Sequence, residues 1–194
     1  MFKLIPNPEN PQLPHLEMER LYLRPIERGD AAAMFAYGSR PDVARLGGFP
    51  VNQDIKEVEA LIVRDQAKTA SNLKMRIYAI IDKTSDQMLG TINFNQKIAP
   101  KILTMGYVLH PDYWGRGMMV EAGEAMLHLA FEYFSCHKIE MTIYDYNVQS
   151  QSVARKLGFT QEGRLRQRLQ LDMIYRDALI FGLLAEEWQS RQKV

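Results

Sequence analysis

The sequence predicts an α+β fold: a single domain with a mixed, mostly antiparallel sheet that contains one parallel strand pair and is flanked by helices. Three observations indicate this. The chain has 194 residues, which suits one hydrophobic core. Short β-branched and aromatic runs alternate with helical patterns along it. A strongly amphipathic helical stretch, 118–134, connects two strand-like segments, and such a crossover makes the two strands parallel.

The elements are predicted from local patterns. Residues 1–16 carry four prolines, which excludes a helix and favours an extended arm outside a domain of residues 17–194. Hydrophobic periodicity and turn residues predict the elements that follow. In the first half these are a strand at 21–25, a helix that Asp30 caps and Pro41 stops, a helix from Asp54 that ends before Leu73, and three strands at 76–82, 88–95 and 102–109. The second half has the helix 118–134, a strand at 138–146, a helix that ends at Gly158, and a terminal hairpin with its turn at 171–173.

Composition and charge exclude several classes of protein. Hydrophobic residues make up 46% and charged residues 24% of the chain, as in ordinary globular proteins. The formal charge of +1 lacks the positive field of a nucleic-acid binder, and no apolar stretch approaches the roughly 18 residues of a membrane helix. The N-terminal segment does not resemble a signal peptide. Cys136 is the only cysteine, so we expect no internal disulfide, no cysteine metal cluster and no metal cofactor, in a reducing cytoplasm.

The segment GYVLHPDYWGRGMMV, residues 106–120, reads as a strand, a glycine-containing loop and the start of a helix. Backbone N–H groups from Gly115 through Val120, together with the helix dipole, would suit a phosphate or pyrophosphate. A nucleotide P-loop is excluded because GxxxxGK[ST] is absent. Taken alone, this is a weak motif, and an ordinary turn before a helix is the simpler interpretation.

A second polar segment, NVQSQSVARKLGF, follows the strand predicted at 138–146. Asn147 and Ser150 stand three residues apart at a helix start, so both side chains could face one ligand. The alternative is that one of them caps this helix.

Together these segments resemble the acetyl-CoA-binding core of the GNAT superfamily of N-acetyltransferases. The resemblance rests on the strand GYVL, the loop PDYWGRG, the amphipathic helix, the next strand and the pattern N-x-x-S-x-x-V-x-x-K-L-G-F. RLYLRP upstream, F-x-x-E-G after the second segment, Y-x-D and a terminal Glu-Trp are similar to the RimJ/RimL-type branch. The similarity covers about residues 17–188.

The resemblance implies roles for individual residues. The loop would bind the cofactor pyrophosphate through Trp114, Gly115, Arg116, Gly117, Met118, Met119 and Val120. The strand residues Tyr107, Val108 and Leu109 would pair with pantetheine, and their amides would stabilise the oxyanion. Asn147 would contact the cofactor arm, and Ser150 would protonate the departing thiolate. Acetyl-CoA is the implied cosubstrate.

This sequence departs from the family pattern at three positions. Trp114 stands where Gln or Arg is common, and Met119 stands where Gly or Ala is usual, which is tolerable if its side chain faces the core. Thr104 replaces a glutamate of several relatives, so the usual candidate base is missing. An amine attacks a thioester only when it is neutral, so a base or a water chain is needed.

Other residues could take part in the reaction. Glu57 and Glu59 fit a base or a solvated helix face, and His110 fits a proton relay or an exposed loop residue. Cys136 reads as a small buried thiol rather than an acetyl-carrying nucleophile, so direct transfer is preferred. Arg164, Arg166 and Arg168 fit one face of a strand or a contact with an acidic substrate.

The sequence thus predicts direct acetyl transfer in a ternary complex to a primary amine, either a protein N-terminus or a small molecule. The alternative is a non-catalytic CoA-binding or regulatory module. Exposed backbone edges on the arm and the terminal hairpin predict a homodimer.

Overall fold

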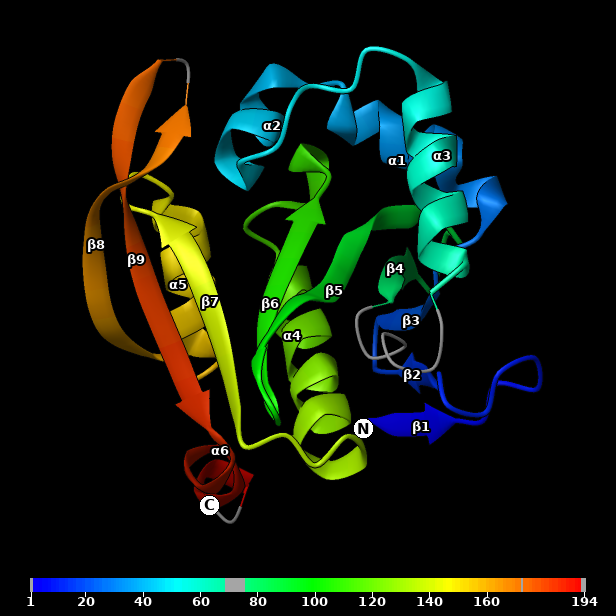
Figure 1. Cartoon of the computed structure of the whole chain (residues 1–194). Coiled ribbons are helices and arrows are strands. Elements are labelled where there is room, and N and C mark those ends of the chain that lie inside the picture. The colour runs from blue at the N-terminus through cyan, green and yellow to red at the C-terminus, as the bar shows by residue number, and fades with distance from the viewer. Residues whose placement is uncertain (1, 69–75, 172, 193–194) are drawn as a thin grey trace. The chain divides into compact units, whose positions relative to one another are not determined.

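The computed structural model in Figure 1 describes residues 2–68, 76–171 and 173–192. The chain forms two compact units. Unit 1 comprises Met1–Phe94 and Tyr107–Met126, and unit 2 comprises Asn95–Gly106 and Leu127–Val194. Two strands, β5 (Met88–Ala99) and β6 (Ile102–Leu109), run through both units.

Unit 1 is a sheet with helices. Its antiparallel strands follow the order β1-β2-β3-β4-β5, and the first four are β1 (Lys3–Ile5), β2 (His15–Glu17), β3 (Leu21–Pro25) and β4 (Ile77–Asp82). The described residues of the proline-rich segment form no helix, as predicted, and they contribute β1 and β2 to this sheet, with turns between the two strands. The helices are α1 (Ala31–Gly38), α2 (Pro41–Gly47), α3 (Ile55–Gln66) and most of α4 (Met118–His128).

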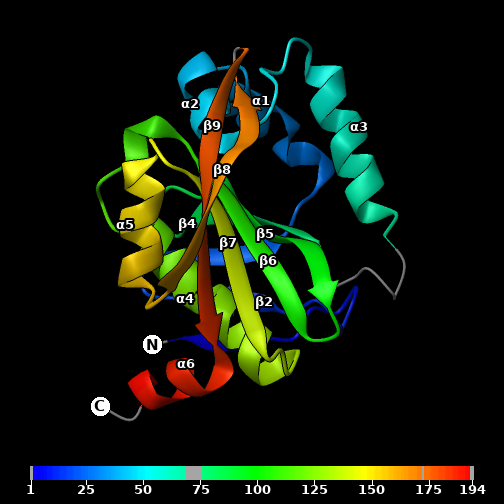
Figure 2. The same cartoon turned by 60° about the vertical axis from the view of Figure 1, so that its left-hand side comes forward.

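Helices α1 and α3 lie side by side in both views (Figures 1 and 2) because they share an apolar cluster. Ile26, Ala31, Val58 and Ile62 are fully or almost fully buried in that cluster. Helix α3 begins next to Asp54 as predicted, and Asp54 is its N-cap, since its carboxylate accepts the Lys56 N–H at 3.0 Å. Burial of the Ile26, Val58 and Ile62 side chains, about 1.5–3 kcal/mol each, holds the two helices together.

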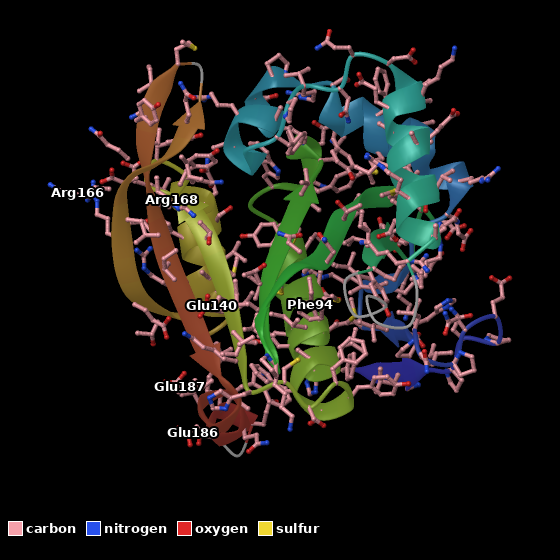
Figure 3. The ribbon with its side chains drawn as sticks, viewed as in Figure 1. Phe94, Glu140, Arg166, Arg168, Glu186 and Glu187 are labelled. Atoms are coloured by element: carbon pink, nitrogen blue, oxygen red, sulfur yellow. The ribbon has the colours of Figure 1, made fainter. Side chains whose placement is uncertain are left out.

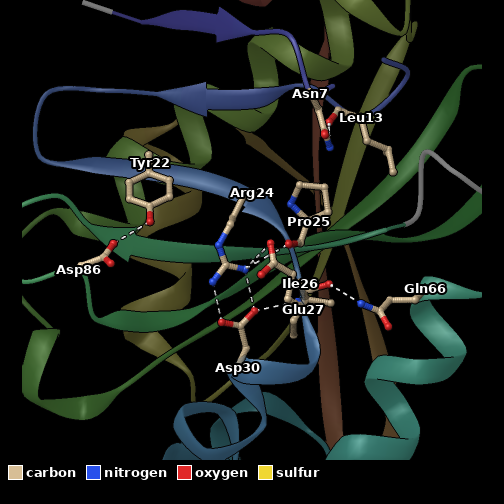
Figure 4. A network of polar contacts seen from close by, with 10 residues as sticks. All are labelled: Asn7, Leu13, Tyr22, Arg24, Pro25, Ile26, Glu27, Asp30, Gln66 and Asp86. Atoms are coloured by element: carbon tan, nitrogen blue, oxygen red, sulfur yellow. Dashed lines mark hydrogen bonds and ion pairs between the residues drawn. The ribbon is translucent and has the colours of Figure 1, made fainter. Parts of the chain in front are cut away.

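Asp30 has another role than the predicted cap. It occupies the N-cap position of α1 but makes no side-chain capping bond there. Its two carboxylate oxygens instead each accept a hydrogen bond from the Arg24 guanidinium at 2.8 Å, and one also accepts the Glu27 N–H (Figure 4). This buried bidentate pair fixes the exit of β3.

The helix α2 was not predicted. Pro41 was interpreted as a stop, yet it is the first residue of α2, a position where its fixed φ and missing N–H cost nothing. Gly48 ends the helix in the left-handed region, with φ 69°.

Unit 2 contains the parallel pair. Its neighbouring strands follow the order β6-β7-β9-β8, with β7 (Lys138–Tyr144), β9 (Ile174–Leu184) and β8 (Thr160–Leu171). β6 and β7 are parallel, whereas the β7–β9 and β8–β9 registers are antiparallel. The predicted fold class, a mixed and mostly antiparallel sheet with one parallel pair, is confirmed. The terminal hairpin is confirmed as well, although Asp172 in its turn lies outside the described residues.

The helical parts of unit 2 complete its core. Helix α5 (Val148–Lys156) lies along β7 (Figure 2). The predicted helix 118–134 ends differently from expectation, because α4 gives way to a π-helical turn at Leu129–Tyr133. A short terminal helix, α6 (Ala185–Gln192), was not predicted; it buries Trp188 against the rings of His128 and Phe131. No helix in the described part of the chain is long and apolar enough to cross a membrane.

Candidate active site

The candidate loop in unit 1 is closed by local hydrogen bonds. β6 ends at Leu109, and the next N–H, of His110, donates to the Leu89 carbonyl at 2.7 Å. A 3-10 turn at Pro111–Tyr113 follows. The Trp114 indole N–H then donates back to the Leu109 carbonyl at 2.8 Å. Trp114 therefore fixes the path of the loop between the strand and α4.

Gly115 and Gly117 shape the start of α4. Both have left-handed backbones, with φ 75° and 77°, and both are exposed together with Arg116 between them. Left-handed residues next to right-handed ones turn successive N–H groups toward one side, which forms an anion-binding nest. The helix that begins at Met118 adds the positive end of its dipole. This geometry fits a phosphate or pyrophosphate.

Room for a ligand exists beside these glycines. A Cβ at Gly115 would meet no atom within 4 Å, and one at Gly117 would meet only the Arg20 guanidinium, at 3.6 Å. Met119 is 5% exposed, so its side chain faces the core and leaves the loop open. A methionine is therefore tolerated at this position of the loop, as expected if its side chain faces the core.

Arg20 is a residue of this site that sequence reasoning missed. Its guanidinium donates to the Arg116 carbonyl at 3.0 Å and to the Glu121 carboxylate at 2.7 Å. Its backbone N–H donates to the same carboxylate at 2.8 Å. Arg20 thus ties the residues before β3 to the start of α4 and places a cation next to the nest. Only folding brings it there, since it lies 96 residues before Arg116.

The backbone of β5 lies very close to β6, the strand that leads into the loop. A Cβ at Gly90 on β5 would lie 2.1 Å from the Val108 carbonyl oxygen. Glycine at this position lets β5 approach β6 along Tyr107, Val108 and Leu109. The strand expected to hold pantetheine is thereby supported on its β5 side.

In unit 2 the structure separates the roles of Asn147 and Ser150. Asn147 is buried, and its side-chain oxygen accepts the Ser150 N–H at 3.0 Å, which makes Asn147 the N-cap of α5. Ser150 is partly exposed, and its hydroxyl has no hydrogen-bond partner in the described part of the chain. Of the two residues, Asn147 is the cap, and the Ser150 hydroxyl is available to a ligand.

Tyr144 closes β7 just before this cap. Its ring stacks on Tyr146, with ring centroids 5.2 Å apart. Burial raises the pKa of the Tyr144 hydroxyl, so the phenol stays protonated at neutral pH. Tyr144 can therefore donate a proton but is not a base under these conditions.

Two candidate bases have structural roles. Glu57 lies in the first turn of α3 and accepts the Gln53 N–H at 3.1 Å, which ties the residue before the N-cap to the helix. His110 Nδ1 accepts the Asp112 N–H at 3.3 Å, which places the proton of the neutral ring on Nε2. In that tautomer the only lone pair of the ring is already used. In this tautomer the His110 ring is not poised to take a proton from a substrate.

The remaining candidates offer no catalytic constellation. Glu59 lies on the exposed side of α3. Cys136 is buried at 4% exposure, in agreement with the interpretation as a packed thiol. Among the described residues, no group of three or more His, Cys, Asp or Glu side chains is arranged to hold a metal ion.

Comparisons with known proteins give the site a context. Residues 20–160 match the family model described as acetyltransferase (GNAT) domain. An uncharacterized N-acetyltransferase of Bacillus subtilis, YoaA, is 30% identical over 156 residues, which cover 79% of this chain and 87% of that protein.

Solved structures show the same fold. Spermidine N-acetyltransferase from Vibrio cholerae, in complex with CoA and spermine, has a TM-score of 0.78 at 18% identity and covers 88% of this chain and 98% of its own. Ribosomal-protein-S5-alanine acetyltransferase from Vibrio fischeri has a TM-score of 0.76 at 19% identity and covers 90% of this chain and 98% of its own. With the family model matching most of its length, the chain belongs to the GNAT acetyltransferase family.

Proposed function

We propose that this protein transfers the acetyl group of acetyl-CoA to a primary amine, by direct attack in a ternary complex. The observation that carries the proposal is the exposed nest at Gly115 and Gly117, with the start of α4 behind it and Arg20 beside it. N–H groups, a helix dipole and a guanidinium suit the pyrophosphate of CoA. CoA is bound in the V. cholerae relative, which has the same fold.

The acceptor is proposed to be either a protein N-terminus or a small amine. Two proteins of the same fold are named for a protein acceptor and a small-amine acceptor, an alanine of ribosomal protein S5 and spermidine. The RimJ/RimL-type features of the sequence, above all RLYLRP and Y-x-D, favour the first kind.

The proposed chemistry assigns one task to each group. The neutral amine attacks the thioester carbonyl carbon, and an amide of the strand Tyr107–Leu109 stabilises the oxyanion. The C–S bond then breaks. The Ser150 hydroxyl gives its proton to the departing sulfur and regains one from the nitrogen. Asn147 holds the start of α5, and with it Ser150, in place.

Turnover tests the proposal. Release of free CoA thiol from acetyl-CoA is measured with N-terminal peptides of ribosomal proteins, polyamines and aminoglycosides, and calorimetry measures CoA binding in parallel. We expect binding, and thiol release with at least one class of amine. Binding without thiol release across the whole panel would favour the non-catalytic CoA-binding module instead.

A further inference from the structure

The parallel pair in unit 2 ends at a carboxylate. The β6–β7 register runs from Ile102↔Lys138 to Thr104↔Glu140 and stops there, although β6 continues to Leu109 and β7 to Tyr144. Glu140 therefore lies at the point where the two strands part. Beyond this point the facing backbone edges of the strands are not joined to each other.

Glu140 points to the face of the sheet opposite the apolar core of unit 2. Leu103, Met105, Ile139 and Met141 are buried on the core face, and Thr104 and Glu140 alternate with them. The side chain of Glu140 is 21% exposed. Figure 3 shows Glu140 on β7, in the interior of the sheet rather than at its rim. Substrate can reach such a group only from this face.

Charged neighbours hold this carboxylate in position. The Lys138 ammonium lies 2.8 Å from Glu140 Oε1 and 2.7 Å from Glu162 Oε2. A Cβ at Gly182, the β9 partner of Glu140, would lie 2.4 Å from the Glu162 carboxylate, so glycine at this position leaves room for Glu162 to lie beside Lys138. One ammonium is shared by two carboxylates, which leaves a net negative charge around Glu140.

The lysine of this cluster is excluded as the base by its own pKa. Burial alone would lower the pKa of Lys138, but its hydrogen bonds to Glu140 and Glu162 outweigh burial and raise this pKa. Lys138 stays an ammonium at neutral pH and cannot be the base. Glu140 Oε1 is used by Lys138, whereas Oε2 accepts no hydrogen bond from any described residue. Oε2 is free for a substrate N–H.

We propose that Glu140 is the general base that deprotonates the acceptor amine. The inference rests on the proposed function. An ammonium N–H bond breaks, and the proton goes to Glu140 Oε2. The freed nitrogen lone pair forms the C–N bond to the thioester carbon, and the C–S bond breaks. A second proton passes from nitrogen to the departing sulfur through Ser150. Glu140 returns its proton to water, so the net products are amide, CoA thiol and one proton.

Glu140→Gln tests the assignment because it keeps the shape of the side chain and removes the basic oxygen. With an alkylamine acceptor at pH 7 we expect kcat/KM to fall about 100-fold or more, while calorimetry shows unchanged CoA binding. Glu17→Gln is the matched control. Glu17 also pairs with a lysine, Lys83 at 2.6 Å, on the surface of unit 1, and its variant should keep wild-type turnover.

A second readout separates proton transfer from mere structure. A weakly basic acceptor that is already neutral at pH 7 needs no base, so the deficit of Glu140→Gln should shrink at least tenfold with it. An equal deficit with both acceptors, or none with the alkylamine, would overturn the role of Glu140 while leaving acetyl transfer intact. Failure of the wild-type protein to release thiol with any amine would instead overturn the proposed function itself.

Discussion

Ser150 and Asn147 should respond to substitution in opposite ways, because only one of them caps α5. The Ser150 hydroxyl bonds to no described residue, so Ser150→Ala should change stability by less than about 0.5 kcal/mol. If the hydroxyl protonates the thiolate, kcat should still fall about 100-fold, with little change in CoA affinity.

Asn147→Ala, in contrast, should lower the stability of the fold. It removes the acceptor that holds the Ser150 N–H at 3.0 Å, at a buried position of 6% exposure. Loss of such a cap costs about 1 kcal/mol, and in a chain of this size that lowers Tm by about 2–4 °C. Asn147→Asp keeps a capping oxygen and should keep Tm, but it replaces the amide donor by an anion and should weaken CoA binding.

Thermal unfolding, calorimetry with CoA and a thiol-release assay on the same preparations measure all three quantities. The reasoning fails if Ser150→Ala is destabilised as much as Asn147→Ala, since the hydroxyl would then have an unrecognised structural partner. It also fails if folded Ser150→Ala turns over normally, which would remove the general acid.

Four further outcomes are expected. Gly117→Asp puts a Cβ and a negative charge in a left-handed nest position, φ 77°, and calorimetry should show severely weakened CoA binding by a folded protein. Asp65→Asn should lower the free energy of unfolding in urea by about 3–5 kcal/mol, because it leaves Arg76, now 2.7 Å from the buried Asp65 carboxylate, without its counter-charge. The Gln167 N–H and, as a smaller cause, the Arg164 guanidinium lower the pKa of Asp177. The ionised Asp177 carboxylate therefore stabilises the fold fully above its ordinary pKa of 3.8, and this stabilisation is lost as the pH falls through the lower pKa of the folded state. The Tm of Asp177→Asn should lack this acid dependence. Sedimentation should show a homodimer at micromolar concentration, and a monomer throughout would contradict that prediction.

The fold could be predicted to the extent that it follows from local patterns. Apolar, alternating and amphipathic runs located all the long strands and the helices α3, α4 and α5, because each of these elements buries at least one face. α2 was missed because Pro41 can stop one helix or begin another, and the sequence does not distinguish these. α6 was missed because Trp188 is its only buried side chain, so no apolar stripe marks it.

The site was predictable where its geometry is local. Glycines before an amphipathic helix predicted the nest, and a cap was one of two interpretations for Asn147 and Ser150. The positions of Arg20 and of the proposed base Glu140 could not be predicted from the sequence, because they depend on contacts between distant segments. Arg20 meets the loop through tertiary contact, and Glu140 gains its position from the register between β6 and β7. Neither depends on a pattern within its own segment.

The outermost strand of unit 2 is poorly suited to recruit another chain. Between Leu165 and Leu169 the β8 register shifts, and the inserted residues include Gln167 with φ 51° and two exposed arginines, Arg166 and Arg168. Arg166 projects away from the hairpin in Figure 3. A bulge twists an edge away from flat pairing, and charged side chains oppose the stacking that leads to aggregates. The edge of unit 1 lacks this protection: β1 is short but carries the exposed Leu4 and Ile5. Self-association of this protein would accordingly be directed to its N-terminal strand, and the long hairpin would remain a solvated, non-adhesive border.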